Sequence, residues 1–319
     1  MEFHRSTAAA LVAIGLLAGC ASQSQPSLVP SSGTNPGASQ LQSAAKIAPD
    51  GHSGRVLYVA DIDGQPGLGQ IHVYPASMNN PQQIRLITNG AGRPFGMFVD
   101  SKNNLFVANQ TDKLPASVTE FKPGASSPFF TISNFKGMPQ SVAVDATGNV
   151  YVHESVGHEG FIEVFPPGKT SAAKSIDTGV GGYAFDAGSV AFDPKGNLII
   201  AEQARLVLHV LSLAPGASTV TPLNLDLKNI SGPGLGIDKA GNLYIASNAG
   251  TISVFAPGQT EPFRTISQAG GYGLTAVTPE GAVYQSNGES TVEEIAPGAG
   301  SPTNLLTCTC SAQGVAVSH

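Results

Sequence analysis

An eleven-residue phrase recurs along the chain, and it restricts the possible folds more than any other feature. Each copy holds two short apolar runs around a turn: MFVDSKNNLFV (97–107), VAVDATGNVYV (142–152), VAFDPKGNLII (190–200), LGIDKAGNLYI (235–245) and the degenerate TAVTPEGAVYQ (275–285). Such runs on both sides of a glycine turn are typical of β-hairpins. The glycine, replaced by Asn103 in one copy, supplies the positive φ that the turn needs. The turn aspartates are expected to accept bonds from backbone N–H groups rather than to act as catalytic acids: Asp100, Asp145, Asp193 and Asp238.

Two further β-type runs follow each phrase and complete a four-stranded repeat. A third run precedes a Pro-Gly turn, as in 117–121, 161–165, 208–213, 251–255 and 291–295, and a fourth comes next, as in 129–132 and 263–266. Four antiparallel strands that recur at roughly 40 to 48 residues are typical of β-propeller blades. The sequence therefore predicts an all-β fold.

The two ends of the repeat region are expected to share one blade. Residues 55–90 hold only three β-type runs, and the missing innermost strand is found at 314–318. Residues 55–319 are therefore predicted to form a six-bladed β-propeller, with four antiparallel strands per blade and the first blade closed by the C-terminal strand. Such closure leaves no long free edge at the seam.

The phrase VAVDATGNVYV resembles the NHL repeat, which is also found in gluconolactonase-like (senescence-marker-like) six-bladed propellers. The resemblance covers nearly all of the chain after residue 54, and it implies the propeller fold. Enzymes of the gluconolactonase-like type take a metal on Glu, Asn and Asp residues where the inner strands begin. In this chain those positions offer one carboxylate, Asp186, without a matching Glu or Asn, so that chemistry does not carry over. The fold by itself implies no reaction.

The first 54 residues are predicted to contain an export signal followed by a flexible tether. Arg5 precedes an apolar run at 8–17, which is too short to span a bilayer as a helix and is typical of an export signal. The run ends in Leu-Ala-Gly-Cys (17–20), which resembles a bacterial lipobox and implies lipidation of Cys20 after removal of residues 1–19. Residues 20–54 are rich in Ser, Gln, Pro and Gly, so they are expected to form a flexible tether. A plain secretory signal with a chance cysteine is the alternative.

Composition narrows the classes of function. A net charge of −6 with only 16 Lys and Arg residues gives no basic surface for nucleic acid. Three cysteines are too few for a disulfide framework or a four-cysteine zinc site. Cys308 and Cys310 could form a tight oxidised pair in an exported protein or remain free thiols.

The end of the second strand of each blade carries the candidate ligand-binding residues. All six positions are polar and three are acidic: Asp61, Asn109, Glu154, Glu202, Ser247 and Asn287. They are expected on the rim of the variable loops, where propellers usually bind their partners. The sharper interpretation is a polar, net acidic channel mouth for a cation or a hydroxyl-rich ligand, and the plainer one is that strands simply end in solvent.

One cluster of histidines and carboxylates carries the candidate metal site. His153, Glu154 and His158 fall in a single predicted loop, and neutral imidazole with carboxylate can ligate a divalent metal. Spacing fixes no third ligand, so we expect no cofactor, with a divalent metal as the alternative. No Gly-x-Ser-x-Gly elbow and no phosphate loop is present.

These features predict a lipid-anchored propeller of the bacterial cell envelope, with the outer membrane favoured, that acts as a non-catalytic binding or scaffold module. Its expected partners are the membrane, through the lipid on Cys20, and an unidentified protein or small molecule on the variable-loop face, but not nucleic acid. The alternative is a metal-dependent envelope hydrolase or lyase with its site in the channel mouth, near His153, Glu154 and Glu202.

Overall fold

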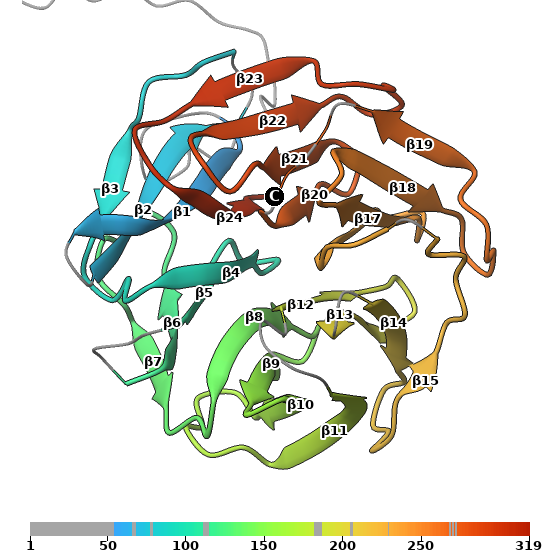
Figure 1. Ribbon diagram of the computed structural model, residues 1–319. Helices are drawn as coiled ribbons and strands as arrows, with labels where there is room; N and C mark the ends of the chain where they lie inside the picture. The colour runs from blue at the N-terminus through green and yellow to red at the C-terminus, as the bar shows by residue number, and fades with distance from the viewer. Residues whose placement is uncertain are drawn as a thin grey trace, which may run out of the picture. The chain divides into compact units, whose positions relative to one another are not determined.

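The computed structural model describes residues 54–65, 68–76, 79–110, 115–181, 187–204, 207–228, 230–267, 269, 271 and 273–319. The predicted signal, tether, lipidation site at Cys20 and Asp186 lie outside these residues. Within them, 24 strands form six four-stranded antiparallel sheets arranged as blades around a centre (Figure 1). The predicted six-bladed all-β propeller is confirmed. None of the described residues forms a helix with the length and apolar character needed to cross a membrane.

In the first three blades, the strands run from the centre of the ring to its periphery in the following order. Blade 1 contains β24 (Ala312–Val317), β1 (Val56–Gln65), β2 (Leu68–Pro75) and β3 (Arg85–Ile87). Blade 2 contains β4 (Pro94–Val99), β5 (Leu105–Asn109), β6 (Ser117–Phe121) and β7 (Phe130–Ser133). Blade 3 contains β8 (Met138–Val144), β9 (Val150–Val156), β10 (Glu159–Phe165) and β11 (Lys174–Gly181).

The last three blades follow the same order. Blade 4 contains β12 (Ala187–Phe192), β13 (Leu198–Ala204), β14 (Val207–Leu213) and β15 (Thr221–Pro222). Blade 5 contains β16 (Gly234–Ile237), β17 (Leu243–Ser247), β18 (Thr251–Phe255) and β19 (Arg264–Ser267). Blade 6 contains β20 (Thr275–Val277), β21 (Val283–Ser286), β22 (Thr291–Ile295) and β23 (Asn304–Thr307).

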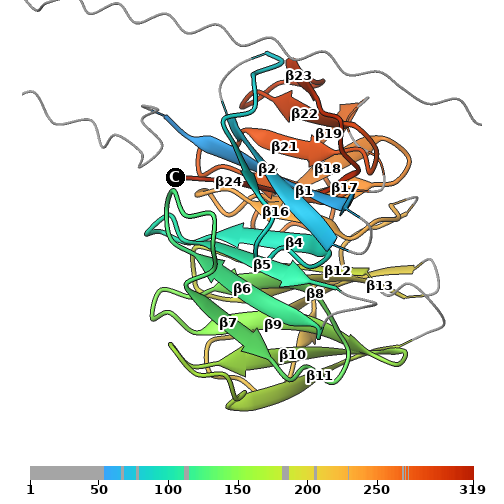
Figure 2. The same cartoon turned by 90° about the vertical axis from the view of Figure 1, so that its left-hand side faces the viewer.

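The first blade is closed by the C-terminal strand, as predicted. β24 pairs antiparallel with β1, from Leu57 opposite Val317 to Ala60 opposite Gly314 (Figure 2). The first blade thereby obtains its inner strand from the far end of the chain, and no sheet of the ring is left incomplete.

The hydrophobic core is divided among the boundaries between blades. Six buried clusters each join two adjacent sheets, because successive residues of a strand point to opposite faces. In β1, for example, Tyr58 packs toward blade 2, while Leu57 and Val59 pack toward blade 6. The alternation of a strand therefore decides which neighbouring blade each of its side chains meets.

The turn aspartate accepts bonds from backbone N–H groups, as predicted, and it also accepts a bond from an asparagine side chain of the same turn. Asp193 Oδ1 accepts bonds of 2.9 Å from Lys195 N and 2.8 Å from Asn197 N. Asn197 Nδ2 also donates to Asp193 Oδ2 at 2.8 Å, and the same amide–carboxylate pair recurs in the turns of Asp100, Asp145 and Asp238. In the degenerate copy, Thr278 Oγ1 takes the carboxylate's place and accepts from Ala282 N at 3.1 Å.

Candidate functional site

The six predicted ligand-binding residues occupy equivalent positions at one rim, and most of them are buried. Only Asn109 and Ser247 end the second strand of their blades, because β1, β9 and β13 continue past Asp61, Glu154 and Glu202, and Asn287 directly follows β21. The exposed fractions are 2% for Asp61, 0% for Asn109, 1% for Glu154, 0% for Glu202 and 1% for Ser247. Asn287 is half-buried. Their burial leaves little of this ring open to a ligand from solvent.

Four of the six side chains hold the segment that leads into the inner strand of their own blade. The bonds run from Ser311 N to Asp61 at 2.9 Å, from Gly92 N to Asn109 at 3.0 Å, from Ser231 N to Ser247 at 3.4 Å, and from Gly137 N to Glu154. Asn287 instead accepts bonds from the backbone N of Glu289 and Thr291, in its own hairpin. A side chain that makes the same backbone bond in several blades has a structural role in the fold.

Asp61 is also the acceptor for a buried histidine. His72 Nε2 lies 3.3 Å from Asp61 Oδ2, and His72 Nδ1 lies 2.5 Å from Gln83 Oε1. Burial alone would raise the pKa of Asp61, but the bonds from His72, Ser311 N, Gln70 and Asp63 N outweigh it and lower the pKa from 3.8 to about 2. Burial opposes protonation of His72, yet Asp61 and Gln83 raise its pKa above 6.5.

The three predicted metal ligands of blade 3 do not point to one place. His153 and Glu154 belong to β9 rather than to a loop, because β9 continues to Val156 and pairs with β10 there. Their side chains therefore point to opposite faces of the sheet. His158 is exposed near the tip of the β9–β10 hairpin, where Gly157 has a φ of 65°.

The environment of Glu154 is that of a buried carboxyl group. Burial raises the pKa of Glu154, the carboxylate of Glu163 raises it further, and the bond from Gly137 N opposes the rise. Val150 and Val152, which share the face of Glu154 on β9, pack at the boundary of blades 2 and 3, so Glu154 lies on that side, away from His153.

His153 instead faces Glu202 across the boundary of blades 3 and 4. His153 Nε2 lies 3.4 Å from Glu202 Oε2, and both side chains are buried. No hydrogen bond from the described residues reaches the ring nitrogens of His153 or the carboxylate oxygens of Glu202. Two glycines leave room for the pair, since a Cβ on Gly188 would strike the imidazole and one on Gly160 would strike the carboxylate.

Other candidate ligands are few. In the described part of the chain, no group of three or more His, Cys, Asp and Glu side chains is arranged to hold a metal ion. Cys308 and Cys310 are joined as a disulfide in the segment between β23 and β24. The tight oxidised pair is thus the arrangement that the structure contains.

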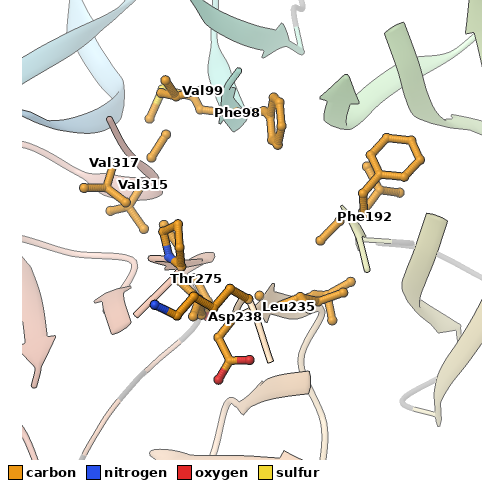
Figure 3. A pocket seen from close by; sticks show the side chains of 18 of the residues that line it. Phe98, Val99, Phe192, Leu235, Asp238, Thr275, Val315 and Val317 are labelled. Atoms are coloured by element: carbon orange, nitrogen blue, oxygen red, sulfur yellow. The ribbon is translucent and has the colours of Figure 1, made fainter. Parts of the chain in front are cut away.

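A cavity of about 440 Å³ lies in the channel between the inner strands. Its wall is formed by the last residues of β4, β12, β16, β20 and β24, and the side chains of Phe98, Phe192, Leu235 and Val315 lie around the opening (Figure 3). The residues that follow these strands, Asp193, Asp238 and Lys239 among them, also line it, so the cavity belongs to the rim of the repeated turns.

The other half of the channel is narrowed by close contact between blades. A Cβ on Gly314 would strike the carbonyl oxygen of Phe95, one on Gly96 would strike that of Gln140, and one on Gly234 would lie 2.6 Å from Thr275 Oγ1. Glycine at these early positions lets adjacent inner strands approach. The channel is thus wide where the cavity lies and narrow toward the variable loops.

The charged groups at the cavity belong to its mouth. The carboxylate of Asp238 is bonded to Ala240 N, Asn242 N and Asn242 Nδ2, and it points away from the opening (Figure 3). Asp193 is held in the same way by its own turn. Lys239 is exposed, and the pKa of Glu280 beside it is lowered mainly by the bond from Arg55, with a smaller contribution from the charge of Lys239. The deeper wall is formed by apolar side chains and Thr275.

No motif of the sequence indicates this cavity. Its residues are ordinary members of the repeated phrase, such as Phe98 and Phe192, and each alone reads as strand core. The one available signal was that the residue before the turn aspartate is apolar in every copy of the phrase that has the aspartate: Val99, Val144, Phe192 and Ile237. Only closure of the ring brings three of these four positions to one opening.

Two solved structures resemble this chain in fold, whereas no family model and no curated protein matches its sequence. Among solved structures, a protein of unknown function from Bacteroides caccae matches with a TM-score of 0.62 at 13% identity, over 83% of this chain and 99% of that one. The WD40 β-propeller domain of Doa1 matches with a TM-score of 0.54 at 15% identity, over 80% of each chain.

Both likenesses show the propeller fold alone. At these identities they carry neither an activity nor a ligand to this chain.

Proposed function

We propose that the protein is a non-catalytic binding module of the bacterial cell envelope, attached to the membrane through lipid on Cys20. The lipobox-like Leu-Ala-Gly-Cys (17–20) and the polar segment after it support the anchor. The observation that carries the binding role is the channel cavity of about 440 Å³, which is within the range of small-molecule pockets, roughly 300–1,000 Å³. The resemblance of the repeated phrase to the NHL repeat is consistent with this role, because such a repeat specifies the fold and not the function.

The cavity supports the binding role better than the predicted polar ring does. Asp61, Asn109, Glu154 and Ser247 use their side chains to hold backbone, whereas the cavity is open space with a defined wall. A partner on the variable-loop face stays a prediction, since the loops there include residues 111–114 and 205–206, which the structure does not describe.

The experiment that tests the proposal uses the full chain in a bacterial host that processes lipoproteins. Wild type should fractionate with membranes and carry lipid mass on Cys20, and Cys20→Ser should move it to the soluble envelope fraction. Native mass spectrometry of gently solubilised wild type should show a bound molecule of low mass. A protein that carries no lipid and fractionates like Cys20→Ser would contradict the anchor, and a protein with no bound molecule would contradict the binding role.

A metal-dependent hydrolase or lyase is the second candidate, and the His153–Glu202 pair favours it. A separation of 3.4 Å between Nε2 and Oε2 suits two ligands of one ion held at the usual distances of about 2 Å. Metal analysis at about pH 8, where histidine is neutral, decides between the two functions. Stoichiometric zinc in wild type that is lost in His153→Ala but kept in His158→Ala would favour the enzyme, and a metal-free wild type would favour the binding module.

A further inference from the structure

The channel cavity has a wall chemistry that selects among small molecules. The strand residues of its lining carry no charge, and Phe98, Phe192, Leu235 and Val315 are among them. The titratable residues of the lining, Asp193, Asp238, Lys239 and His319, all follow the ends of the strands. Moving an ionised group from water into such surroundings without a partner is very costly. A ligand whose charge must enter the cavity is therefore disfavoured.

The backbone adds a limited capacity for hydrogen bonds. Each inner strand is the first or last strand of its sheet, so one of its edges faces the channel rather than another strand (Figure 1). The free edge of a strand presents N–H and C=O groups. The wall is thus mostly hydrocarbon, with scattered neutral donors and acceptors.

The enclosure of the cavity limits the size of the occupant. The lining residues come from five of the six blades, so a ligand must enter from the rim of the repeated turns and fit inside a ring. A folded protein or a duplex cannot enter, whereas a compact small molecule can.

From these three properties we infer that the cavity binds a small neutral apolar molecule with few polar groups. The inference rests on the proposed binding function and names its ligand class. Phe98 and Phe192 supply aromatic faces, the valines and Leu235 supply apolar contact, and the free strand edges bond the polar group.

A matched pair of fluorescent probes tests the ligand class on the purified protein. N-phenyl-1-naphthylamine is neutral, and 8-anilinonaphthalene-1-sulfonate has the same aromatic skeleton with an added sulfonate. The neutral probe should bind saturably at one site per chain, and the sulfonate should bind at least about tenfold more weakly. Equal or tighter binding of the sulfonate, or no saturable binding of either probe, would overturn the inference.

Matched variants test the location. Val317 lines the cavity at the end of β24, and Val144 ends β8, the one inner strand that does not contribute to the wall. Val317→Phe should weaken the neutral probe about tenfold or more, while Val144→Phe should leave its affinity within about twofold. Ala191→Phe, on β12, fills the cavity from another blade and serves if Val317→Phe does not fold.

The outcomes separate this inference from the proposed function. Binding of the neutral probe that all three folded variants retain would place it elsewhere on the protein and overturn the inference. Loss of the lipid anchor or of the co-purifying molecule contradicts the proposed function without changing the probe result on purified protein.

Discussion

At the scale of single residues, Asp61 joins the first blade to the segment that completes the ring. Its carboxylate accepts from Ser311 N at 2.9 Å and from Gln70 Nε2 at 3.1 Å, and it faces His72. Ser311 directly precedes β24, so this carboxylate orients the strand that closes the propeller. Asn109, Glu154 and Ser247 hold the segments before their own inner strands in the same way. Asn287 instead holds its own hairpin, and Glu202 faces His153.

The Asp61–His72 pair should make stability depend on pH in two steps. Because the pKa of Asp61 is lowered to about 2, its contribution is present above 3.8 and is lost as pH falls through about 2. Because the pKa of His72 is raised, its contribution is present below 6.5 and is lost as pH rises through the folded value. The pair should therefore contribute most between these limits, and Asp61→Asn should lower the free energy of unfolding by about 1–3 kcal/mol there.

A double-mutant cycle measures this contribution. Asp61→Asn, His72→Gln and the double variant are compared with wild type by urea denaturation near pH 5 and near pH 9. The coupling energy should be about 1 kcal/mol or more near pH 5 and much smaller near pH 9. A coupling that is equal at both values would mean that the protonation of His72 does not change between them and would contradict this pH dependence.

At the scale of elements, the hairpin turn is the unit that the sequence specifies most fully. Aspartate, glycine and asparagine occur together because the carboxylate holds two backbone N–H groups, the amide holds the carboxylate, and the glycine has positive φ, as Gly196 does at 82°. Asn103 takes the glycine position in one copy at a φ of 62°. Asparagine is one of the few residues other than glycine that adopt positive φ readily.

Substitutions at Gly196 should follow this rule. The nearest atom to an added Cβ is Cγ of Pro215 at 3.6 Å, so space is sufficient and the backbone conformation decides the cost. Gly196→Asn should lower the free energy of unfolding by about 1 kcal/mol or less, whereas Gly196→Val should lower it by about 2 kcal/mol. Thermal and urea denaturation of the two variants gives the comparison, and equal losses would show that packing rather than φ controls the position.

Whether a strand continued past its polar end could not be predicted from its own residues. Residues 153–160 read as a loop because they contain His153, Glu154 and two glycines, yet β9 and β10 extend into them. The reason is tertiary. Glu154 is held by Gly137 N, and His153 is covered by blade 4, so polar side chains remain inside the sheet. His153 and Glu154, which were predicted to bind one metal because they are adjacent in the sequence, therefore lie on opposite faces of the sheet.

At the scale of the whole molecule, repeat counting predicted the ring and its seam but not the channel. The number of β-type runs fixed six blades, and the missing run before 55 pointed to 314–318. The cavity depends on how closely inner strands approach, which is set by contacts such as Gly314 with Phe95 and Gly96 with Gln140. Those contacts join residues of different blades, so the width of the channel cannot be predicted from the sequence of any single repeat.

The seam reproduces the bonds of an unbroken turn. In blade 2, Asp100 N donates to Asn104 O at 3.0 Å and Asn104 N donates to Asp100 Oδ1 at 2.8 Å. At the seam, Ser318 N donates to Val56 O at 2.9 Å and Val56 N donates to Ser318 Oγ at 2.8 Å. Ser318 thus takes the aspartate position and Val56 the asparagine position of a turn whose chain is open.

Removal of the closing strand should therefore destabilise the ring as a whole. Deletion of 314–319 takes Val315 and Ala316 out of two different clusters and leaves the paired edge of β1 exposed. The loss should be several kcal/mol, at about 1 kcal/mol for each of a handful of buried residues, which is a large part of the stability of an ordinary domain.

Ser318→Ala should cost about 1 kcal/mol through its bond to Val56 N, and deletion of His319 alone, which keeps β24, serves as the matched control. Circular dichroism melts of the four proteins should rank wild type and the His319 deletion above Ser318→Ala, and Ser318→Ala above the strand deletion. An unchanged melting temperature after the strand deletion would mean that β24 does not hold the first blade in solution.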